Sequence, residues 1–523
     1  MTRINSNIPS LVAQSNLRKA NAGLNVRLER LSTGLRINKG ADDPAGLIIS
    51  ERLRSEIEGI GQGIKNTERA SNVIATTEGA LSEVSDLLNS IKALVVEASN
   101  TGAFSLEEIE ANQRAIDSAI DSITRISNTS SFAGLKLLNG ELGYSLSGVD
   151  TSKILKTQIN AANFLQRTDI QVDVEVVGSA QQGQLFLRTD FSSNPPFNPP
   201  GVDGTLSSSV SIEIAGPEGV DVLTFVSGQT VNDIITAVST RSAKTGISAE
   251  LAGGNVSSGI RFFTNEYGGS SVASVKKLSG GQDWQTYRLP NNAAPDTLDW
   301  TTPATYVASD EDAGKDVVAL VNGALATGRG LELSLRSSDL DLEFLLDETF
   351  ATLVDPANAD TFHVTGGGAL YQIGPNVEPA TEINIGIQSI ASSRLGGVLL
   401  DNEAGTPEVQ FLQSLRTGEY NSLQASRNRQ GFTGASKILN QAIDEIATLR
   451  GRLGAFERNT LQTNVRSLQS GLENLTAAES VIRDADFAHE TSELTRSQIL
   501  ASSSTTVLAT ANAQAQNVLQ LLG

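Results

Sequence analysis

The sequence predicts a multidomain α + β protein in which helical segments at both ends of the chain enclose a β-rich insertion. Three observations support this fold class. Apolar residues recur at heptad spacing near both termini, two inner segments repeat apolar residues every three or four positions, and the region between them alternates apolar with polar residues. The 523 residues are too many for one hydrophobic core, so we expect several.

The terminal segments, residues 1–42 and 481–523, are predicted to be long helices that form a coiled coil. Residues 1–41 contain seven Lys and Arg against one Glu, whereas residues 481–523 contain two against four acidic residues, so the two arms carry opposite charge. Arms this long usually meet other chains, although an ordinary intrachain core is the alternative. The expected packing residues are Leu17, Leu24, Leu28, Leu31, Leu35, Leu494, Ala501, Leu508, Ala511, Ala515, Val518 and Leu522.

Residues 43–175 and 385–480 are predicted to form a helical rod with a β-hairpin. A helix start at Asp43-Pro44 and a capping box from Ser105 to Glu108 mark two helices, and glycines around residues 135–142 indicate the hairpin. A third long helix continues past Phe456 with a phase adjustment before Leu461. The expected rod core is Ile74, Leu81, Val84, Leu88, Ile91, Val95, Ile116, Ile120, Ile123, Leu449, Leu453 and Phe456.

Residues 176–384 are predicted to be a separate β-rich domain. Apolar and polar residues alternate from Ile170 to Val176, and similar patterns predict strands at residues 210–214, 331–335 and 340–344. Residues 231–238 have the pattern of a short amphipathic helix. Residues 315–322 echo them, which weakly favours an internal duplication.

The two ends of the chain contain a series of nine different short motifs. They are residues 3–5 (RIN), 31–37 (LSTGLRI), 42–46 (DDPAG), 132–138 (FAGLKLL), 450–456 (RGRLGAF), 474–475 (NL), 478–480 (AES), 482–486 (IRDAD) and 514–519 (QAQNVL). With these motifs the chain resembles the bacterial flagellins. The resemblance covers about half of the chain, and a segment at about 205–280 is similar to a repeat module inserted in many flagellins.

The resemblance implies a structural subunit that polymerises into an extracellular flagellar filament for swimming motility. Both termini would lie together at the filament core and fold on assembly, with the rod outside them and the variable β-rich domain outermost. The implied partners are copies of the same chain, the flagellar export apparatus, a flagellin export chaperone, the filament cap and the hook-junction proteins. Export without a cleaved signal peptide is also implied, and the N-terminal residues lack the apolar core of such a signal.

The family also contains a helix segment that a Toll-like innate immune receptor recognises. That segment aligns with residues 89–97, where Lys92 and Leu94 are compatible with recognition. Ser90 stands where the family commonly has an arginine, so strong receptor recognition is not expected.

Composition and motifs argue against several other functions. A net charge of −20 disfavours nucleic-acid binding, and no stretch approaches the ~20 apolar residues of a membrane span. The chain has two histidines, and the sequence from His489 to Glu493 ends in Glu where a zinc protease would need its second His. We therefore expect no enzyme activity, cofactor or metal. Two other functions stay open, namely a hook-filament junction protein and an adhesin or glycan-binding role of the outer domain.

Overall fold

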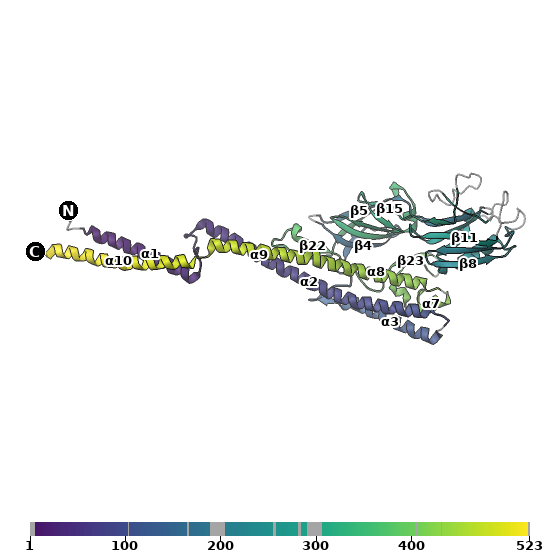
Figure 1. The fold of residues 1–523 in the computed structure, drawn as a ribbon, viewed down its shortest axis with the longest axis horizontal. Helices are drawn as coiled ribbons and strands as arrows, with labels where there is room; N and C mark the ends of the chain where they lie inside the picture. The colour runs from purple at the N-terminus through teal and green to yellow at the C-terminus, as the bar shows by residue number, and fades with distance from the viewer. Residues whose placement is uncertain are drawn as a thin grey trace. The chain divides into compact units, whose positions relative to one another are not determined.

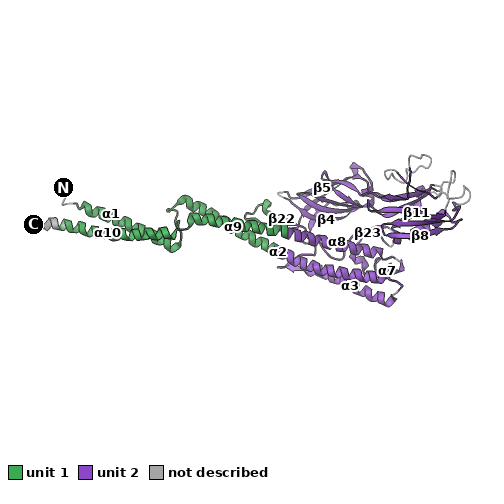
Figure 2. Cartoon of the chain, in the orientation of Figure 1, with its two compact units in different colours: residues 1–70, 372–382, 458–523 green, residues 71–371, 383–457 purple. Residues whose placement is uncertain are grey.

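The computed structural model describes residues 6–102, 104–164, 167–188, 204–254, 258–280, 284–289, 306–402, 406–429 and 431–520. Leu522 and the side chains of Ala515 and Val518 lie outside this description. The chain divides into two compact units (Figure 2). Unit 1 comprises residues 1–70, 372–382 and 458–523, and unit 2 comprises residues 71–371 and 383–457.

Two terminal helices pair in unit 1. Helix α1 (Ile8–Thr33) begins at the N-cap Asn7 and ends at Gly34, whose φ of 73° suits a glycine. Helix α10 (Phe487–Gln520) runs antiparallel to it, so the two chain ends lie at the same end of the pair (Figure 1). At the other end, Leu35 and Asp484 form an antiparallel bridge. The predicted pair of terminal helices is thus present.

The first part of α2 (Pro44–Ser99) packs against α9 (Gln462–Arg483) in unit 1. Arg483 pairs with Glu51 at 3.1 Å, and Asn464 Nδ2 donates to Thr67 Oγ1 at 3.3 Å. Because residue numbers rise along one helix and fall along the other, the two helices are antiparallel. Residues 372–382, which include the short helix η6 (Pro379–Thr381), complete this unit.

The rod in unit 2 is built from the rest of α2, α3 (Leu106–Thr129), α7 (Leu423–Asn428) and α8 (Thr433–Phe456). The predicted capping box is confirmed, since Glu108 N donates to Ser105 Oγ at 3.3 Å and Ser105 N donates to Glu108 Oε2 at 2.8 Å. The long helix from Ile438 onward is also confirmed. It contains a π-helical turn, Glu457–Leu461, which accommodates the five-residue step from Phe456 to Leu461.

The β-hairpin of the rod lies earlier than predicted. Strands β1 (Ser131–Phe132) and β2 (Leu135–Lys136) are joined by Ala133 and Gly134, whose φ angles are 50° and 90°. A two-residue turn with positive φ at both positions matches the right-handed twist of the strands. The predicted hairpin is therefore present, but it begins at Ser131 rather than at Leu135, because Gly134 lies in its turn and not at its start.

A two-sheet sandwich forms the first half of the β-rich part. Its sheets have strand orders β16-β15-β5-β20-β3 and β17-β18-β19-β4, and they enclose a core that includes Val172, Phe344 and Phe362. Its strands are β3 (Tyr144–Ser147), β4 (Ile154–Ala162), β5 (Ile170–Gly178), β15 (Val318–Val321), β16 (Ala324–Leu325), β17 (Thr327–Arg329), β18 (Glu332–Arg336), β19 (Leu340–Leu346) and β20 (Asp360–Gly367).

A second pair of sheets follows, with strand orders β13-β12-β6-β10-β9 and β14-β11-β7-β8. Helix α4 (Val231–Ser239) covers its core through Val231, Ile234 and Val238, and α5 (Ser242–Thr245) follows. The strands are β6 (Gln182–Leu187), β7 (Val210–Gly216), β8 (Gly219–Phe225), β9 (Ile247–Leu251), β10 (Ile260–Tyr267), β11 (Val272–Gly280), β12 (Thr286–Arg288), β13 (Val307–Ala308) and β14 (Glu311–Ala313).

Short elements complete the described fold. They are η1 (Ala252–Gly254), α6 (Glu348–Thr352), η5 (Pro356–Asn358), β21 (Ala369–Gln372), β22 (Glu382–Ile385), β23 (Val398–Asp401), β24 (Pro407–Gln410) and η7 (Leu412–Leu415).

Two expectations for the β-rich part need correction. The structure begins this part at β3, so the expected division between residues 175 and 176 falls inside β5. Strand β4 was missed because most of its residues are partly buried on both faces, which removes the alternating pattern. Residues 315–322, which echo the helical pattern of residues 231–238, contain strand β15 instead of a helix. This strand is connected to β16 by a turn at Asn322 and Gly323, whose φ angles are 51° and 77°.

Candidate functional site: the paired terminal helices

Helices α1 and α10 meet along one heptad seam. On α1, Ser10 and Ala13 are buried, and Leu17, Leu24 and Leu31 are half-buried. On α10, Leu494, Ala501 and Leu508 are half-buried and Ala511 is buried. The structure therefore brings most of the predicted arm residues together inside one chain. Leu35 is half-buried at the bridge to Asp484, whereas Leu28 is 47% exposed.

Polar contacts set the register of this pair at its free end. Asn7 Nδ2 donates to the carbonyl oxygen of Ala511 at 3.0 Å, and the Ser10 hydroxyl donates to Asn512 Oδ1 at 2.8 Å. A slip by one heptad would break both bonds and leave partly buried polar groups unpaired. These contacts therefore specify which residues of the two helices face each other.

An ion-pair cluster sits at the opposite end of the seam. The Glu490 side chain is only 4% exposed, and it accepts hydrogen bonds from Arg27 at 2.8 Å and from Arg30 at 3.1 Å. Burial acts to raise the pKa of Glu490, but the bonds and charges of the two arginines outweigh it and hold that pKa below its usual value. The opposite charge of the arms predicted attraction in general, but the sequence did not single out these three residues.

Large apolar side chains cover the outer faces of both helices. On α1, Ile8, Leu11 and Val12 are 54%, 58% and 55% exposed, and on α10 Ile499 and Leu500 are 61% and 52% exposed. The seam does not use these residues, and side chains of this kind in such number mark a protein–protein contact surface. Amphipathic helices with a second apolar face can pack against helices of other chains. A heptad pattern follows a single stripe of each helix, so it did not predict this second face.

Most of the residues predicted for the rod core are buried in the single chain. Ile74, Leu81, Val84, Leu88 and Ile91 have no exposed surface, and the remaining members of the set are also buried except Phe456, which is half-buried. In the segment aligned with receptor recognition, Ser90 and Lys92 are exposed and Leu94 is half-buried. The residue at the position of the family's arginine is therefore on the surface.

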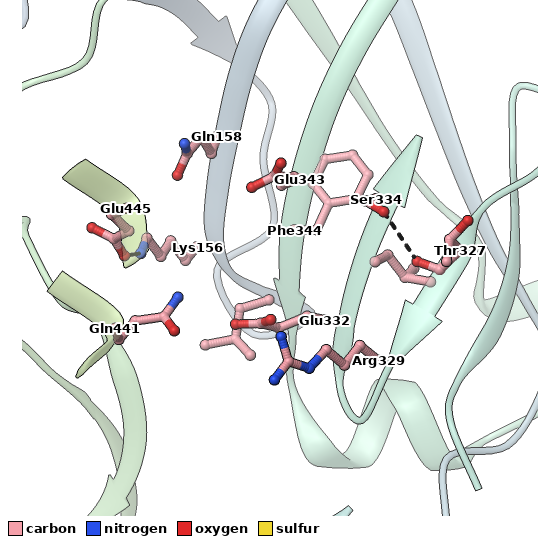
Figure 3. A pocket seen from close by; sticks show the side chains of 12 residues that line it. Lys156, Gln158, Thr327, Arg329, Glu332, Ser334, Glu343, Phe344, Gln441 and Glu445 are labelled. Carbon is pink, nitrogen blue, oxygen red and sulfur yellow. Dashed lines mark hydrogen bonds and ion pairs between the residues drawn. The ribbon is translucent and has the colours of Figure 1, made fainter. Parts of the chain in front are cut away.

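The structure also contains a cavity of about 290 Å³ between α8 and strands β4, β18 and β19 (Figure 3). Lys156 of β4 forms an ion pair with Glu445 of α8 at its edge, and Glu343 of β19 accepts a hydrogen bond from Asn160 at 3.3 Å. The Lys156–Glu445 pair therefore links the sheet to the helix, whereas the Glu343 bond joins two neighbouring strands of the sheet. Within the described ranges, no group of three or more His, Asp or Glu side chains is placed to hold a metal ion.

Comparison with known families decides the identity of the chain. A family model described as the bacterial flagellin N-terminal helical region matches residues 4–142. A model described as the bacterial flagellin C-terminal helical region matches residues 436–522. The chain belongs to the bacterial flagellin family. The two matched regions contain all of α1 and all of α10, the two helices that form the apolar pair described above.

Several curated flagellins are similar to this flagellin along the full length. Flagellins of Salmonella muenchen and Salmonella typhimurium are each 28% identical to it, and flagellin B of Helicobacter pylori is also 28% identical. Each comparison covers 99% of this chain and 99% of the relative. The likeness is thus not confined to the terminal helices.

Solved structures with a partial likeness include two other flagellar proteins. The hook associated protein-3 of Legionella pneumophila matches 82% of this chain and 97% of its own at 12% identity, with a TM-score of 0.29. FliC of Burkholderia pseudomallei matches 76% of this chain and 99% of its own at 11% identity, with a TM-score of 0.21. At TM-scores this low, the likeness says nothing about function.

Proposed function

We propose that this flagellin is a structural subunit of an extracellular bacterial flagellar filament and that α1 and α10 are its polymerisation surface. One observation carries the proposal. The terminal helices bury one apolar stripe against each other and still expose a second set of large apolar residues, including Leu11, Ile499 and Leu500. Copies of the same helices are the natural partners for that second face, because the chain belongs to a family of filament proteins.

The terminal helices fold when the subunit joins the filament. They contain 26 and 34 residues, yet the buried residues described in them are Ser10, Ala13, Glu490 and Ala511. Ordering a residue costs about 1–2 kcal/mol of backbone entropy, and two buried alanines with a half-buried leucine seam return too little to offset it. Contacts with neighbouring subunits supply the missing apolar burial, so assembly and folding are coupled.

The subunit reaches the filament by the flagellar export apparatus, with an export chaperone and without a cleaved signal peptide. Two features support this route. The chain has no cysteine, so no disulfide has to be reduced before it is threaded unfolded, and its N-terminal arm has little buried surface. None of the described helices has a stretch long and apolar enough to span a membrane. Unchanged secretion after replacement of residues 1–41 by an unrelated sequence would count against this route.

The filament subunit is better supported than the junction protein or the adhesin. The full-length relatives of this chain named above are flagellins, which favours the filament. A junction protein would share the arms but occur in few copies, so the abundance of the chain in sheared filaments separates the two. Within the wider assembly, the filament cap and the hook-junction proteins are the expected neighbours at the filament ends.

Deletion of residues 494–523 tests the proposal. The variant loses most of α10 and with it both the seam and the outer face of the arm. We expect a soluble monomer that keeps most of its strand signal in circular dichroism but forms no filaments after seeding. The full-length protein, seeded in parallel, is the control. Filaments of the shortened chain in electron micrographs would overturn the proposal.

A further inference from the structure

A closed loop at residues 372–382, here called the return loop, is tied together by its own polar groups. Gln372 Nε2 donates to Thr381 Oγ1 at 2.8 Å, and Ile373 N donates to the carbonyl oxygen of Thr381 at 3.0 Å. The Thr381 hydroxyl in turn donates to the carbonyl oxygens of Asn376 at 2.8 Å and of Glu378 at 2.9 Å. These bonds cross-link the loop at its base and fix the conformation of its tip.

The return loop is anchored on α2 and α9. Asn464 Nδ2 of α9 donates to the carbonyl oxygen of Ile373 at 2.9 Å. On α2, a Cβ atom added to Gly59 would lie 2.8 Å from the carbonyl oxygen of Pro375, and one added to Gly63 would lie 3.2 Å from that of Ile373. The two glycines therefore let the loop lie directly on the helix backbone. The loop is a rigid projection from unit 1.

A solvent-exposed valine lies at the tip of the return loop. Val377 is 88% exposed, which is the highest value among the large apolar residues of the described chain. Nothing in the loop's hydrogen-bond network depends on its side chain. A rigid loop that presents an apolar side chain to solvent is suited to insert that side chain into a partner, because little entropy remains to be lost on binding.

A second apolar surface lies elsewhere on unit 1, where the start of α2 and the end of α9 adjoin. Ile48 and Ile49 are 59% and 50% exposed, and Val481 is 79% exposed. The ion pair between Glu51 and Arg483 joins these two helix ends at 3.1 Å. These three apolar residues are called the spoke patch below.

Charge complementarity relates the loop tip to the spoke patch. Glu378, next to Val377, is exposed and negative. Arg52 is also exposed, and it lies four positions after Ile48 and three after Ile49, so all three share one face of α2. Apolar residues at the tip and in the patch, with Glu378 beside the former and Arg52 beside the latter, give the two surfaces one complementary pair of charges.

We propose that Val377 of one subunit inserts into the spoke patch of a neighbouring copy of the chain. This rests on the proposed function, which supplies the second copy. Because the tip and the patch are different surfaces of one molecule, the contact is head-to-tail, and repeated head-to-tail contacts extend into a helical polymer rather than closing a dimer. The return loop thus adds a filament contact that is separate from the terminal helices.

Critical concentration for polymerisation gives the first test. Val377→Asp places a charge where the apolar contact forms, and we expect it to raise the critical concentration roughly tenfold. Val226→Asp is the matched control, because Val226 is 57% exposed just beyond β8 in unit 2, and it should assemble like the wild type. Circular dichroism of the monomers checks that both variants fold. An unchanged critical concentration for Val377→Asp would overturn the proposal.

Disulfide trapping gives the second test. Because the chain contains no cysteine, only the introduced cysteines can form a disulfide. Val377→Cys combined with Ile48→Cys, with Ile49→Cys or with Val481→Cys should give a ladder of cross-linked oligomers from oxidised filaments for at least one pair. The single Val377→Cys variant should give no dimer, and dimers from it would show a symmetric contact and overturn the proposal.

The two proposals fail in different ways. Wild-type filaments that give no ladder with any of the three pairs would overturn the loop contact and leave the filament function standing. Failure of the wild type to polymerise after seeding would overturn the filament function and the loop contact with it.

Discussion

Arg27 and Glu490 lie 463 positions apart in the sequence, yet Arg27 Nη1 donates to both carboxylate oxygens of Glu490, at 2.9 and 2.8 Å. Arg30 adds a third bond at 3.1 Å. Glu490→Gln should weaken the pairing of α1 and α10 by about 2 kcal/mol, because a nearly buried carboxylate loses its charged bonds. The measurement is the temperature at which filaments dissociate. Glu493→Gln is the control, since Glu493 pairs only within α10, with Arg496 at 3.3 Å.

Acid should weaken the filaments through the same group. The two arginines hold the pKa of Glu490 below its ordinary value of 4.5 in the folded protein. A lowered pKa means that the ionised carboxylate stabilises the helix pair at pH values above 4.5, and this stabilisation is lost as the pH falls through the lowered pKa. Sedimentation of filaments across pH 3 to 7 measures this loss of stability. Once Glu490 is fully protonated, the loss should equal the whole contribution of its ion pairs with Arg27 and Arg30. A wild-type profile identical to that of Glu490→Gln would contradict this assignment.

The outer face of α10 should control assembly without supporting the fold of the free subunit. Leu500 is 52% exposed in the single chain. Leu500→Asp should raise the critical concentration by roughly 30-fold, since burying a leucine contributes about 2 kcal/mol. Leu500→Met keeps an apolar side chain of similar volume and should assemble normally. Equal critical concentrations for the two variants would show that Leu500 is not part of the contact surface.

The rod core should determine the stability of unit 2. Leu88 has no exposed surface, so Leu88→Ala should lower the free energy of unfolding by about 3 kcal/mol through the lost contacts and the cavity that remains. Val96, on the same helix, is 61% exposed, and Val96→Ala should change that free energy by less than about 0.5 kcal/mol. Urea denaturation of the monomers measures both. A loss of similar size in the two variants would contradict the core assignment.

Arg452 should join the rod helix α8 to the sandwich. Its Nη2 atom donates to the carbonyl oxygen of Asn160 at 2.8 Å, and the Asn160 amide donates to Asp341 at 3.1 Å. Arg452→Ala removes both bonds that the guanidinium donates to Asn160, to its side-chain oxygen and to its carbonyl oxygen, and should cost about 2 kcal/mol in the free energy of unfolding. Arg114→Ala is the control, because the Arg114 side chain is 81% exposed on α3. Equal melting curves for the two variants would show that the bridge adds no stability.

The helical parts of the fold were predictable because each carries a local signal. The stripe through Leu494, Ala501 and Leu508 lies in the seam, and the capping box at Ser105 forms as its sequence indicates. The apolar pattern of the long helix also shifts its phase between Phe456 and Leu461 in the sequence, and a π-helical turn accounts for this shift. Local backbone chemistry and periodicity are sufficient for such features.

Features that depend on distant contacts were not predictable from the same signals. The start of the β-rich part was misplaced because β4 is partly covered on both faces by other elements. Partners such as Arg27 with Glu490, or Arg452 with Asn160, are hundreds of residues apart, and no spacing rule connects them. In the sequence, Val377 could not be distinguished from a core valine, because the exposure of its side chain depends on how the surrounding chain folds.

The roles of the predicted arm residues stay predictions. The structure places Leu17, Leu24 and Leu31 against α10 of the same chain, while Leu28 faces outward. We expect residues of both kinds to contribute in a filament, with the seam pairing the arms and the outer face contacting neighbouring subunits. The assignment of each residue to one or the other rests on the variants described above.

Hydrogen exchange of the monomer and of the filament tests the central claim most directly. If α1 and α10 fold on assembly, their backbone amides should exchange within seconds in the monomer and become strongly protected in the filament. Amides of α3 and of the buried strand β5 should be protected in both states and provide the internal reference. Equal protection of α1 and α10 in the monomer and the filament would contradict the account, because the helices would then be folded before any neighbour is present.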